Sequence, residues 1–341
     1  MALKVVLDAS GGDYAPAEPV KGAVEAAQMH GLAPILVGRE AEIRAELAKY
    51  DTKGLDLQIV DAPDVVGMDE HPVHAVRRKR QSSMVVGMDL VRDGKAGAFV
   101  SAGNSGAVLA AGLFELGRIE GIDRPAISAL YPTLHGHCLL LDIGANTEVK
   151  PANLVQFALL GSVYMEKVLG RARPRVALLA NGEEDTKGCL VVQEAHKLLR
   201  QSQLNFVGNV EGRDIPTGEL ADVVVCDGFV GNVVLKLSEG LSDTLFGLIK
   251  AEVNSSLLTK LGAGLMKAAF RRIKKRLDPE EVGGAPLLGV KGVVIIAHGR
   301  SKAKAIRNAL RVAQQGVDQR MVEAVVEGLR LSEPDTTPAA G

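Results

Sequence analysis

Short apolar runs alternate along this chain with longer amphipathic stretches, and most apolar runs end in small polar residues and glycines. Continuous apolar runs are typical of parallel strands that helices cover on both faces. In the first part of the chain this pattern predicts strands at 3–7, 34–37, 57–60 and 98–100 and helices from about Pro16 and at 39–49, 72–91 and 107–116. In sheets that are built from repeated β–α units, ligands bind at the carboxyl ends of the strands.

The pattern changes after residue 125. Apolar segments at 126–131 and 137–141, with a turn between them, predict an inserted β-hairpin. Winding then resumes, with predicted strands at 176–179, 206–210, 223–226, 283–290 and 293–297 and predicted helices at 151–168, 189–201, 302–315 and up to about 331. We therefore expect a single large α/β unit over 1–331 and a disordered tail over 332–341, which is rich in Pro, Thr and Ala.

Between the predicted strands at 223–226 and 283–290, the residue pattern is helical and contains two stripes of leucine. The pattern predicts a helical hairpin at about 233–276 with a break near Ser255. Its second arm ends in a strongly basic segment that includes Arg271, Arg272, Lys274 and Lys275. Two interpretations stay open: the apolar stripes pack on their own core or on a second subunit, or the hairpin presents a membrane or acidic-partner surface.

Six loops that follow apolar strands, and one near residue 300, combine glycine with short polar side chains. One such loop could be a tight connection or a helix cap, whereas the whole set favours one shared site. The candidate binding residues are Asp8, Gly11, Gly12, Asp13, Ser101, Gly103, Asn104, Ser105, Gly106, Asp142, Asn146, Asn181, Glu183, Glu211, Asp227, Gly231, His298 and Ser301, and the same loops carry Lys187 and Asn232.

The loop at 101–106 joins a predicted strand to a predicted helix and is a natural seat for an oxyanion such as phosphate. Backbone N–H groups at a helix start are free, the helix dipole adds positive charge, and glycine lets an anion approach the backbone. A connection that needs small residues only for packing is the alternative. The loops at 181–188 and 298–301 are the other candidate positions for the anion.

Composition narrows the function classes. The 341 residues are 47% apolar and only 3% aromatic, with 38 glycines, and the formal net charge of −1 favours neither nucleic acid nor an anionic membrane as a bulk partner. Three cysteines without CxxC spacing suggest a reducing cytoplasm and neither disulfides nor zinc. Because the chain lacks the Walker, GxGxxG and GxSxG motifs and its histidines lack ligand spacing, we expect no nucleotide, no cofactor and no metal.

Seven motifs in a fixed order resemble the bacterial phosphate acyltransferase (PlsX) family of phospholipid synthesis. The resemblance spans residues 3 to about 330, with Ser10 and Ser105 as mild departures from the common family pattern. The motifs are LDASGGD at 7–13, SAGNSGA at 101–107, LDIGAN at 141–146, NGEEDTKG at 181–188, GNVEGRD at 208–214, DGFVGNVVLK at 227–236 and GGAPLLGV at 283–290.

The resemblance implies a Rossmann-like three-layer α/β/α fold related to isopropylmalate dehydrogenase and phosphotransacetylase, and a homodimer. It implies transfer of a fatty acyl group from acyl carrier protein to inorganic phosphate, in a cytoplasmic protein for which peripheral membrane contact stays open. The acyl phosphate product would feed a downstream membrane acyl-phosphate:glycerol-3-phosphate acyltransferase. By position in the family motifs, Lys187 and Asn232 are the expected catalytic residues.

Two rival hypotheses belong to other classes. A metal-dependent decarboxylating dehydrogenase would share the fold but would need a magnesium site and a dinucleotide site. A non-catalytic membrane or carrier-protein adaptor would use the helical hairpin and would not need the loop residues.

Overall fold

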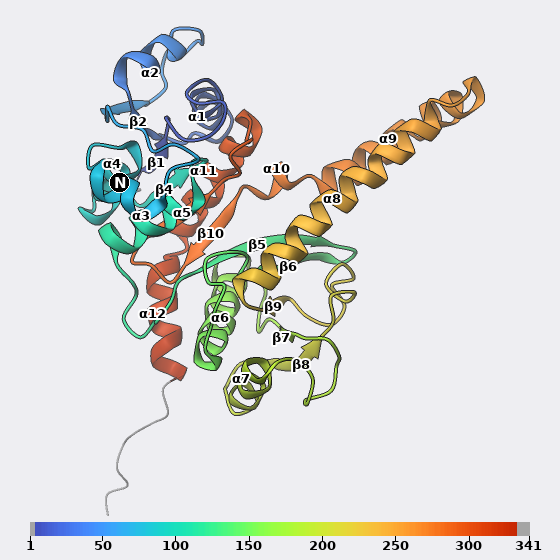
Figure 1. Cartoon of the computed structure of the whole chain (residues 1–341). Coiled ribbons are helices and arrows are strands. Elements are labelled where there is room, and N and C mark those ends of the chain that lie inside the picture. Colours follow the sequence, from blue (N-terminus) through green and yellow to red (C-terminus); the bar gives the residue numbers. More distant parts are fainter. Residues whose placement is uncertain (1–3, 333–341) are drawn as a thin grey trace, which may run out of the picture.

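One 11-stranded sheet extends across the computed structural model, which describes residues 4–332 (Figure 1). The strand order is β3-β2-β1-β4-β11-β10-β5-β6-β9-β7-β8. The strands are β1 Val5–Asp8, β2 Ile35–Gly38, β3 Gln58–Asp61, β4 Ala98–Ser101, β5 Ala126–Thr133, β6 Gly136–Leu141, β7 Val176–Leu179, β8 Phe206–Val210, β9 Val223–Val225, β10 Ala285–Leu288 and β11 Val293–Ile296.

Strand direction reverses at the middle of this sheet. Strands β3, β2, β1, β4 and β11 are parallel to one another. Strand β10 is antiparallel to both β11 and β5, and β5 and β6 form the predicted antiparallel hairpin. Strands β6, β9, β7 and β8 are again mutually parallel, but they run opposite to the first block. The carboxyl ends of the strands in the two blocks therefore lie on opposite sides of the sheet. We call these two sides, which run across the ends of the strands, the edges of the sheet.

Helices cover both faces of the sheet. They are α1 Ala17–His30, α2 Glu40–Leu47, α3 Pro72–Arg78, α4 Ser83–Arg92, α5 Ser105–Ala111, α6 Pro151–Val163, α7 Leu190–Arg200, α8 Gly228–Val253, α9 Leu257–Leu277, α10 Pro279–Val282, α11 Ala303–Asp318 and α12 Met321–Ser332, with π-helical turns η1 Gly112–Leu116 and η2 Tyr164–Val168. Alternate residues of β1 point to different layers: Leu7 packs in a core cluster with residues of α1 and α11, and Val6 packs in another with residues of α4 and α5. The predicted three-layer arrangement is confirmed.

The predicted helix at 72–91 is wrong, because the structure has two helices there. Helix α3 ends at Arg78, and the Lys79 ammonium turns away to donate to the Val65 carbonyl at 2.6 Å. Helix α4 then starts afresh behind Ser82, whose hydroxyl accepts from the Val85 N–H. The helix predicted from residue 107 begins two residues earlier, at Ser105.

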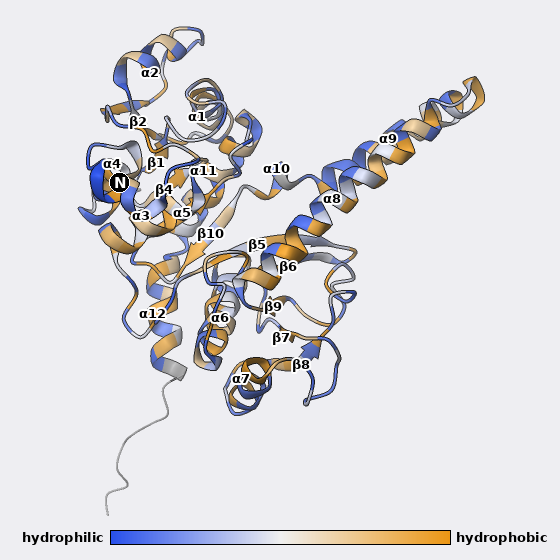
Figure 2. Cartoon of the chain, viewed as in Figure 1, coloured by the Kyte–Doolittle hydropathy of each residue, from blue (hydrophilic) through white to orange (hydrophobic). Residues whose placement is uncertain are grey.

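The hairpin of α8 and α9 projects away from the body of the protein, as predicted (Figure 1). Its break lies at 254–256, where the Ser256 hydroxyl accepts from the Thr259 N–H at 3.1 Å and caps α9. Apolar positions run along both arms (Figure 2). On α8, the side chains of Leu237, Leu241, Leu245 and Leu248 are between 53% and 69% exposed. None of the described helices is long and apolar enough to cross a membrane. The predicted tail lies outside the described residues except for Ser332, where α12 ends.

The core on the α4 side is tightly packed around Phe99, which is fully buried. A side chain at Gly87 of α4 would overlap the Phe99 ring, so no space is left between the helix and β4. We expect Phe99→Ala to lower the free energy of unfolding by about 3–5 kcal/mol, because it removes this buried ring and leaves a cavity. Phe114→Ala is the matched control: that ring is 44% exposed, and its loss should cost less than about 1 kcal/mol. Urea unfolding measures both, and equal effects would contradict this account of the core.

Candidate active site

Three loops from the first block of strands meet at its carboxyl edge: 8–13 after β1, 101–106 after β4 and 298–301 after β11. We call them the first loop group. The Asp8 carboxylate accepts from the Ser101 hydroxyl at 2.7 Å, and that hydroxyl accepts from the Gly103 N–H at 3.0 Å. The Asp13 N–H donates to the Gly299 carbonyl at 2.8 Å. The structure thus brings together loops that are separated by nearly 300 residues in the sequence.

Asp8 is a buried carboxyl group with no ion-pair partner among the described residues. Burial raises its pKa, while hydrogen bonds from Ser83, Ser101 and the Ser10 and Gly11 backbone act in the opposite direction. Sequence reasoning missed Ser83, which begins α4. The carboxyl group of Asp8 holds the first loop group together, and its burial favours the protonated form relative to an exposed aspartate.

Glycines allow close approach of these loops. Gly12 has a φ of 103°, which favours glycine, and a side chain there would lie 3.2 Å from the Gly299 carbonyl oxygen. Gly103 is different, because its φ lies outside the left-handed region. A side chain at Gly103 would meet the terminal methyl group of Met84, which ends a flexible side chain, so packing favours glycine here without requiring it, and its role in admitting an anion stays a prediction.

The first turn of α5 is the part of this group that remains open. The Asn104 side chain forms three hydrogen bonds within the protein. Its oxygen accepts from the Ala107 N–H at 3.1 Å, and its amide nitrogen donates to the Met68 and Glu70 carbonyls at 3.0 and 3.2 Å. Ser105 is exposed, and in the part of the chain that the structure describes its hydroxyl makes no hydrogen bond. Gly106 follows at a half-buried position, and the N–H groups of Ser105 and Gly106 have no hydrogen-bond partner in the described chain, whereas those of Ala107 and Val108 donate to Asn104.

The turn after β6 and the start of α8 form the second loop group, comprising 142–147 and 227–232. The Asp142 carboxylate accepts five hydrogen bonds, from the N–H groups of Ile127, Gly144, Ala145 and Asn146 and from the Asn146 side-chain amide. Burial raises the pKa of Asp142, and these donors oppose the rise. Asp142 and Asn146 therefore shape the turn.

Helix α8 packs directly on this turn. The Asp227 carboxylate caps the helix by accepting from the Phe229 and Val230 N–H groups, both at 2.9 Å. A side chain at Gly231 would overlap the Asp142 carbonyl, so only glycine fits at that position. Asn232, the next residue, is exposed and free of these structural contacts.

Helix α8 links the second loop group to the first. Burial lowers the pKa of His298, the positive charge of Lys236 lowers it further, and the Glu239 carboxylate, which pairs with Lys236 at 2.8 Å, acts in the opposite direction. Asn232 and Lys236 are four residues apart and so share one face of α8. Lys236 was missed as a site residue, although its spacing from Asn232 within one motif was a usable signal.

The loops at 181–188 and 211–214 form the third loop group. The Asn181 side-chain oxygen accepts from the Gly188 N–H at 2.8 Å and closes the first of these loops. The Asn209 amide donates to the Glu184 carbonyl at 2.8 Å, and the buried His196 ring contacts Asn209 at 3.0 Å. Lys187 itself is exposed, and within 4–332 its ammonium group has no carboxylate partner. The loop is thus held rigidly while its lysine stays available.

Glu183, Glu211 and Asp214 lie close together, with carboxylate oxygens within 4.8 Å of one another. Arg213 is their counter-ion, at 2.5 Å from Glu211 and 3.6 Å from Glu183. The cluster is partly exposed, and this arginine offsets only one of the three carboxylate charges. Glu183 and Glu211 each pair with Arg213, and their role in binding stays a prediction.

The second and third loop groups share one edge of the sheet. Strand β9 pairs in parallel with both β6 and β7, so the loops after these three strands are neighbours. Lys187 and Asn232 are the exposed polar residues of this edge that the family motifs single out. Within the described chain, no hydrogen bond or ion pair joins the third group to the first.

Solved structures place this fold in the phosphotransacetylase class. A phosphotransacetylase from Streptococcus pyogenes aligns with a TM-score of 0.61 over 93% of this chain and 94% of its own, at 17% identity. The EutD phosphotransacetylase from Staphylococcus aureus aligns with a TM-score of 0.58 over 92% of this chain and 94% of its own, also at 17% identity. At these identities, the likeness concerns the fold alone.

Sequence comparison identifies the family. The family described as "Fatty acid synthesis protein" matches residues 3–324. The phosphate acyltransferase of Pelotomaculum thermopropionicum is 53% identical over 331 residues, covering 97% of this chain and 96% of that protein. The phosphate acyltransferase of Heliobacterium modesticaldum is 56% identical over 326 residues, covering 95% and 97%. The chain belongs to the phosphate acyltransferase family, and it is an acyltransferase of lipid biosynthesis, as the seven motifs predicted.

The buried Asp8 generates a prediction about pH and stability. Because its folded pKa is raised above the unfolded value near 3.8, the unfolded chain ionises first, and stability is lost as pH rises from about 3.8 through the folded pKa. Asp8→Asn removes this loss of stability, because an asparagine side chain does not ionise. We therefore expect the variant to melt at a higher temperature than the wild type at pH 7, with a smaller difference at pH 4.

The exposed Asp243 on α8 provides the control, because Asp243→Asn should shift the melting temperature little at either pH. Thermal unfolding at the two pH values measures all three proteins. An Asp8→Asn variant that is less stable than the wild type at pH 7 would show that the carboxylate contributes more through its hydrogen bonds than its burial costs.

Proposed function

We propose that this acyltransferase moves a fatty acyl group from acyl carrier protein to inorganic phosphate and releases acyl phosphate. The observation that carries this proposal is the exposure of Lys187 and Asn232 on neighbouring loops in which structural contacts occupy Asn181 and Asp227. Membership of the phosphate acyltransferase family supports phosphate as the acceptor. The acyl carrier protein as donor rests on the motif resemblance alone.

The reaction needs positioning and electrostatic stabilisation more than a covalent intermediate. A phosphate oxygen attacks the thioester carbonyl carbon, a new C–O bond forms, and the tetrahedral intermediate then expels the thiolate with its electron pair. A thiolate is a good leaving group, so little acid catalysis is required. In this proposal the Lys187 ammonium and the Asn232 amide donate to the oxyanion of the intermediate, and the backbone holds the nucleophile in place.

We place the phosphate at the first turn of α5, which requires the first loop group to approach Lys187 and Asn232, at the opposite edge of the sheet, when the substrates bind. The Ser105 hydroxyl and the unpaired N–H groups there supply donors, and the helix dipole adds positive charge. The nearby Asp8 does not oppose an anion when it is protonated, and its burial raises its pKa in that direction.

The base of the helical hairpin suits an acidic carrier protein. Arg271, Arg272, Lys274 and Lys275 are exposed and have no carboxylate partner in the described part of the chain. Arg276 beside them donates to the Leu134 carbonyl at 2.5 Å, which fixes this end of α9 against the β5–β6 hairpin. Unpaired surface cations steer acidic partners and raise the association rate.

Assembly and location extend the same proposal. The exposed leucines of α8 and α9 support a homodimer or peripheral membrane contact of a cytoplasmic protein, because unpartnered apolar stripes of this length mark interaction surfaces. Release of acyl phosphate near a membrane would supply a membrane acyl-phosphate:glycerol-3-phosphate acyltransferase.

Replacing Lys187 tests the chemistry. We expect Lys187→Ala to lower kcat by about 100- to 1,000-fold, as loss of one oxyanion donor typically does, while the melting temperature stays unchanged because the side chain is exposed. Lys197→Ala, an exposed lysine on the following helix, is the matched control and should keep wild-type activity. The assay follows acyl phosphate formed from palmitoyl acyl carrier protein and inorganic phosphate. A folded Lys187→Ala protein with normal turnover would refute the assignment.

A second prediction concerns the carrier protein. Exchange of Arg271, Arg272, Lys274 and Lys275 for glutamine should weaken binding of acyl carrier protein about tenfold or more, and wild-type binding should weaken with added salt. Exchange of Arg39, Arg44, Lys49 and Lys53 changes the net charge equally at a distant surface and should leave binding nearly unchanged. Surface plasmon resonance at two salt concentrations compares them. Equal losses in both variants would mean that net charge alone matters.

A further inference from the structure

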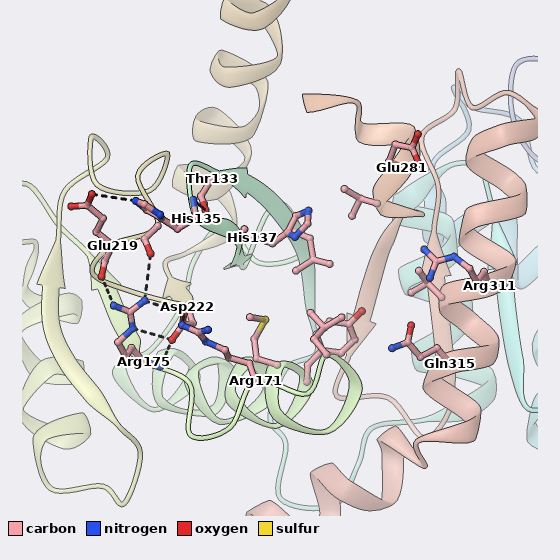
Figure 3. Close-up of a pocket in the computed structure, with 18 residues that line it drawn as sticks. Thr133, His135, His137, Arg171, Arg175, Glu219, Asp222, Glu281, Arg311 and Gln315 are labelled. Carbon is pink, nitrogen blue, oxygen red and sulfur yellow. Dashed lines mark hydrogen bonds and ion pairs between the residues drawn. The ribbon is translucent and has the colours of Figure 1, made fainter. Parts of the chain in front are cut away.

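A cavity of about 690 Å³ lies outside the three loop groups, and no residue predicted for the active site lines it (Figure 3). One wall comes from the end of the β5–β6 hairpin, from η2 and from the residues that begin β7 and β9. The other wall comes from α10 and from the last turns of α11. Because it adjoins the amino ends of β6, β9 and β7, it lies at the opposite edge from Lys187 and Asn232.

Charge on the first wall is balanced internally. Asp222 accepts from Arg175 at 3.0 Å and pairs with Arg171 at 3.1 Å, and Glu219 lies 3.4 Å from His135. Figure 3 shows these groups turned toward one another. On this side, each acidic group already has a basic partner.

The second wall carries an uncompensated cation. Glu281 pairs with Lys304 at 3.0 Å, whereas Arg311 forms no ion pair or hydrogen bond with any group in 4–332. Figure 3 shows Arg311 and Gln315 together on α11. The Gln315 amide nitrogen donates to the Val168 carbonyl at 2.6 Å. An anion that entered the cavity would therefore meet an unpaired guanidinium.

Tyr164 adds a second, independent sign of a ligand. It lines the cavity and is only 1% exposed, yet its hydroxyl has no hydrogen-bond partner in the described chain. Burial raises the pKa of this hydroxyl, so it remains a neutral donor, and the positive charge of nearby Arg311 acts on it in the opposite direction. A buried hydroxyl without a partner is costly, and an anion beside Arg311 would satisfy it.

We propose that this cavity is a second binding site, for a small amphipathic anion with a carboxylate or phosphate-monoester head and an apolar tail. The head lies between the Arg311 guanidinium and the Tyr164 hydroxyl. The tail contacts the apolar part of the lining, namely Leu130, Met165, Leu169, Val282 and Val312. The volume lies within the usual range for small-molecule sites. This site is independent of the acyl-transfer reaction and does not rest on the proposed function.

Calorimetric titration of the full chain tests the site with decanoate, decyl phosphate and the uncharged decanol. We expect both anions to bind more tightly than decanol, and the tighter of the two identifies the preferred head. Arg311→Gln should weaken anion binding by about tenfold or more, and Tyr164→Phe by about fivefold, because each removes a donor to the charged head. The exposed Arg330 on α12 provides the control, and Arg330→Gln should bind as the wild type does.

Two measurements keep the test decisive. Tyr164→Phe keeps the ring and removes only the unpartnered hydroxyl, so it should melt at or above the wild-type temperature in the absence of probe. Wild-type affinity in both Arg311→Gln and Tyr164→Phe would overturn the proposal, because any bound anion would then lie elsewhere, for example at the acyl-transfer site. A wild type that binds neither anion would also overturn the proposal. If Arg311→Gln then changed the sedimentation coefficient, the cavity would be assigned to contact with a second copy of the chain.

Discussion

The three antiparallel pairings at the centre of the sheet, β11–β10, β10–β5 and β5–β6, determine where chemistry can occur in this protein. Because strand direction reverses three times, the parallel blocks on the two sides run in opposite directions. A uniformly parallel sheet would collect all its polar loops at one edge. Here the loops of β1, β4 and β11 lie at one edge, and those of β6, β7, β8 and β9 lie at the other. Helix α8 begins at the second edge, and the charge of its Lys236 contributes to lowering the pKa of His298, which lies in a loop at the first edge.

Hydrogen bonding divides the polar loop residues into two kinds. Asp142, Asp227 and Asn104 satisfy backbone N–H groups at turns and helix starts, where unpaired buried donors would be costly. Lys187 and Asn232 sit beside these groups but remain exposed. The structural residues hold the loops in one conformation, and the side chains of Lys187 and Asn232 are not needed for that. A short polar side chain next to glycine therefore indicates a loop of fixed shape and does not by itself indicate a binding residue.

Two buried groups carry a cost that the fold does not relieve. Asp8 has a raised pKa and no counter-ion in the described chain, and the Tyr164 hydroxyl has no hydrogen-bond partner there. Proteins commonly retain such unfavourable groups at functional positions at the expense of stability. Asp8 lies in the loop group that we assign to phosphate, and Tyr164 lies in a cavity that no sequence motif marks.

The sequence by itself determined most elements and the family, because apolar runs, glycines and seven ordered motifs are local signals. The β5–β6 hairpin, the strands and the helical hairpin follow from such signals, whereas the division of 72–91 into α3 and α4 depends on Lys79 reaching Val65 and on Ser82 capping a new helix. Only the tertiary structure decided which loops share an edge, because strand order and direction depend on long-range pairing. It also decided that Gly103 lies against Met84, and that Arg311 and Tyr164, 147 residues apart, line one cavity. Burial and the presence or absence of a partner arise from contacts between distant segments, and the local pattern of residues does not encode them.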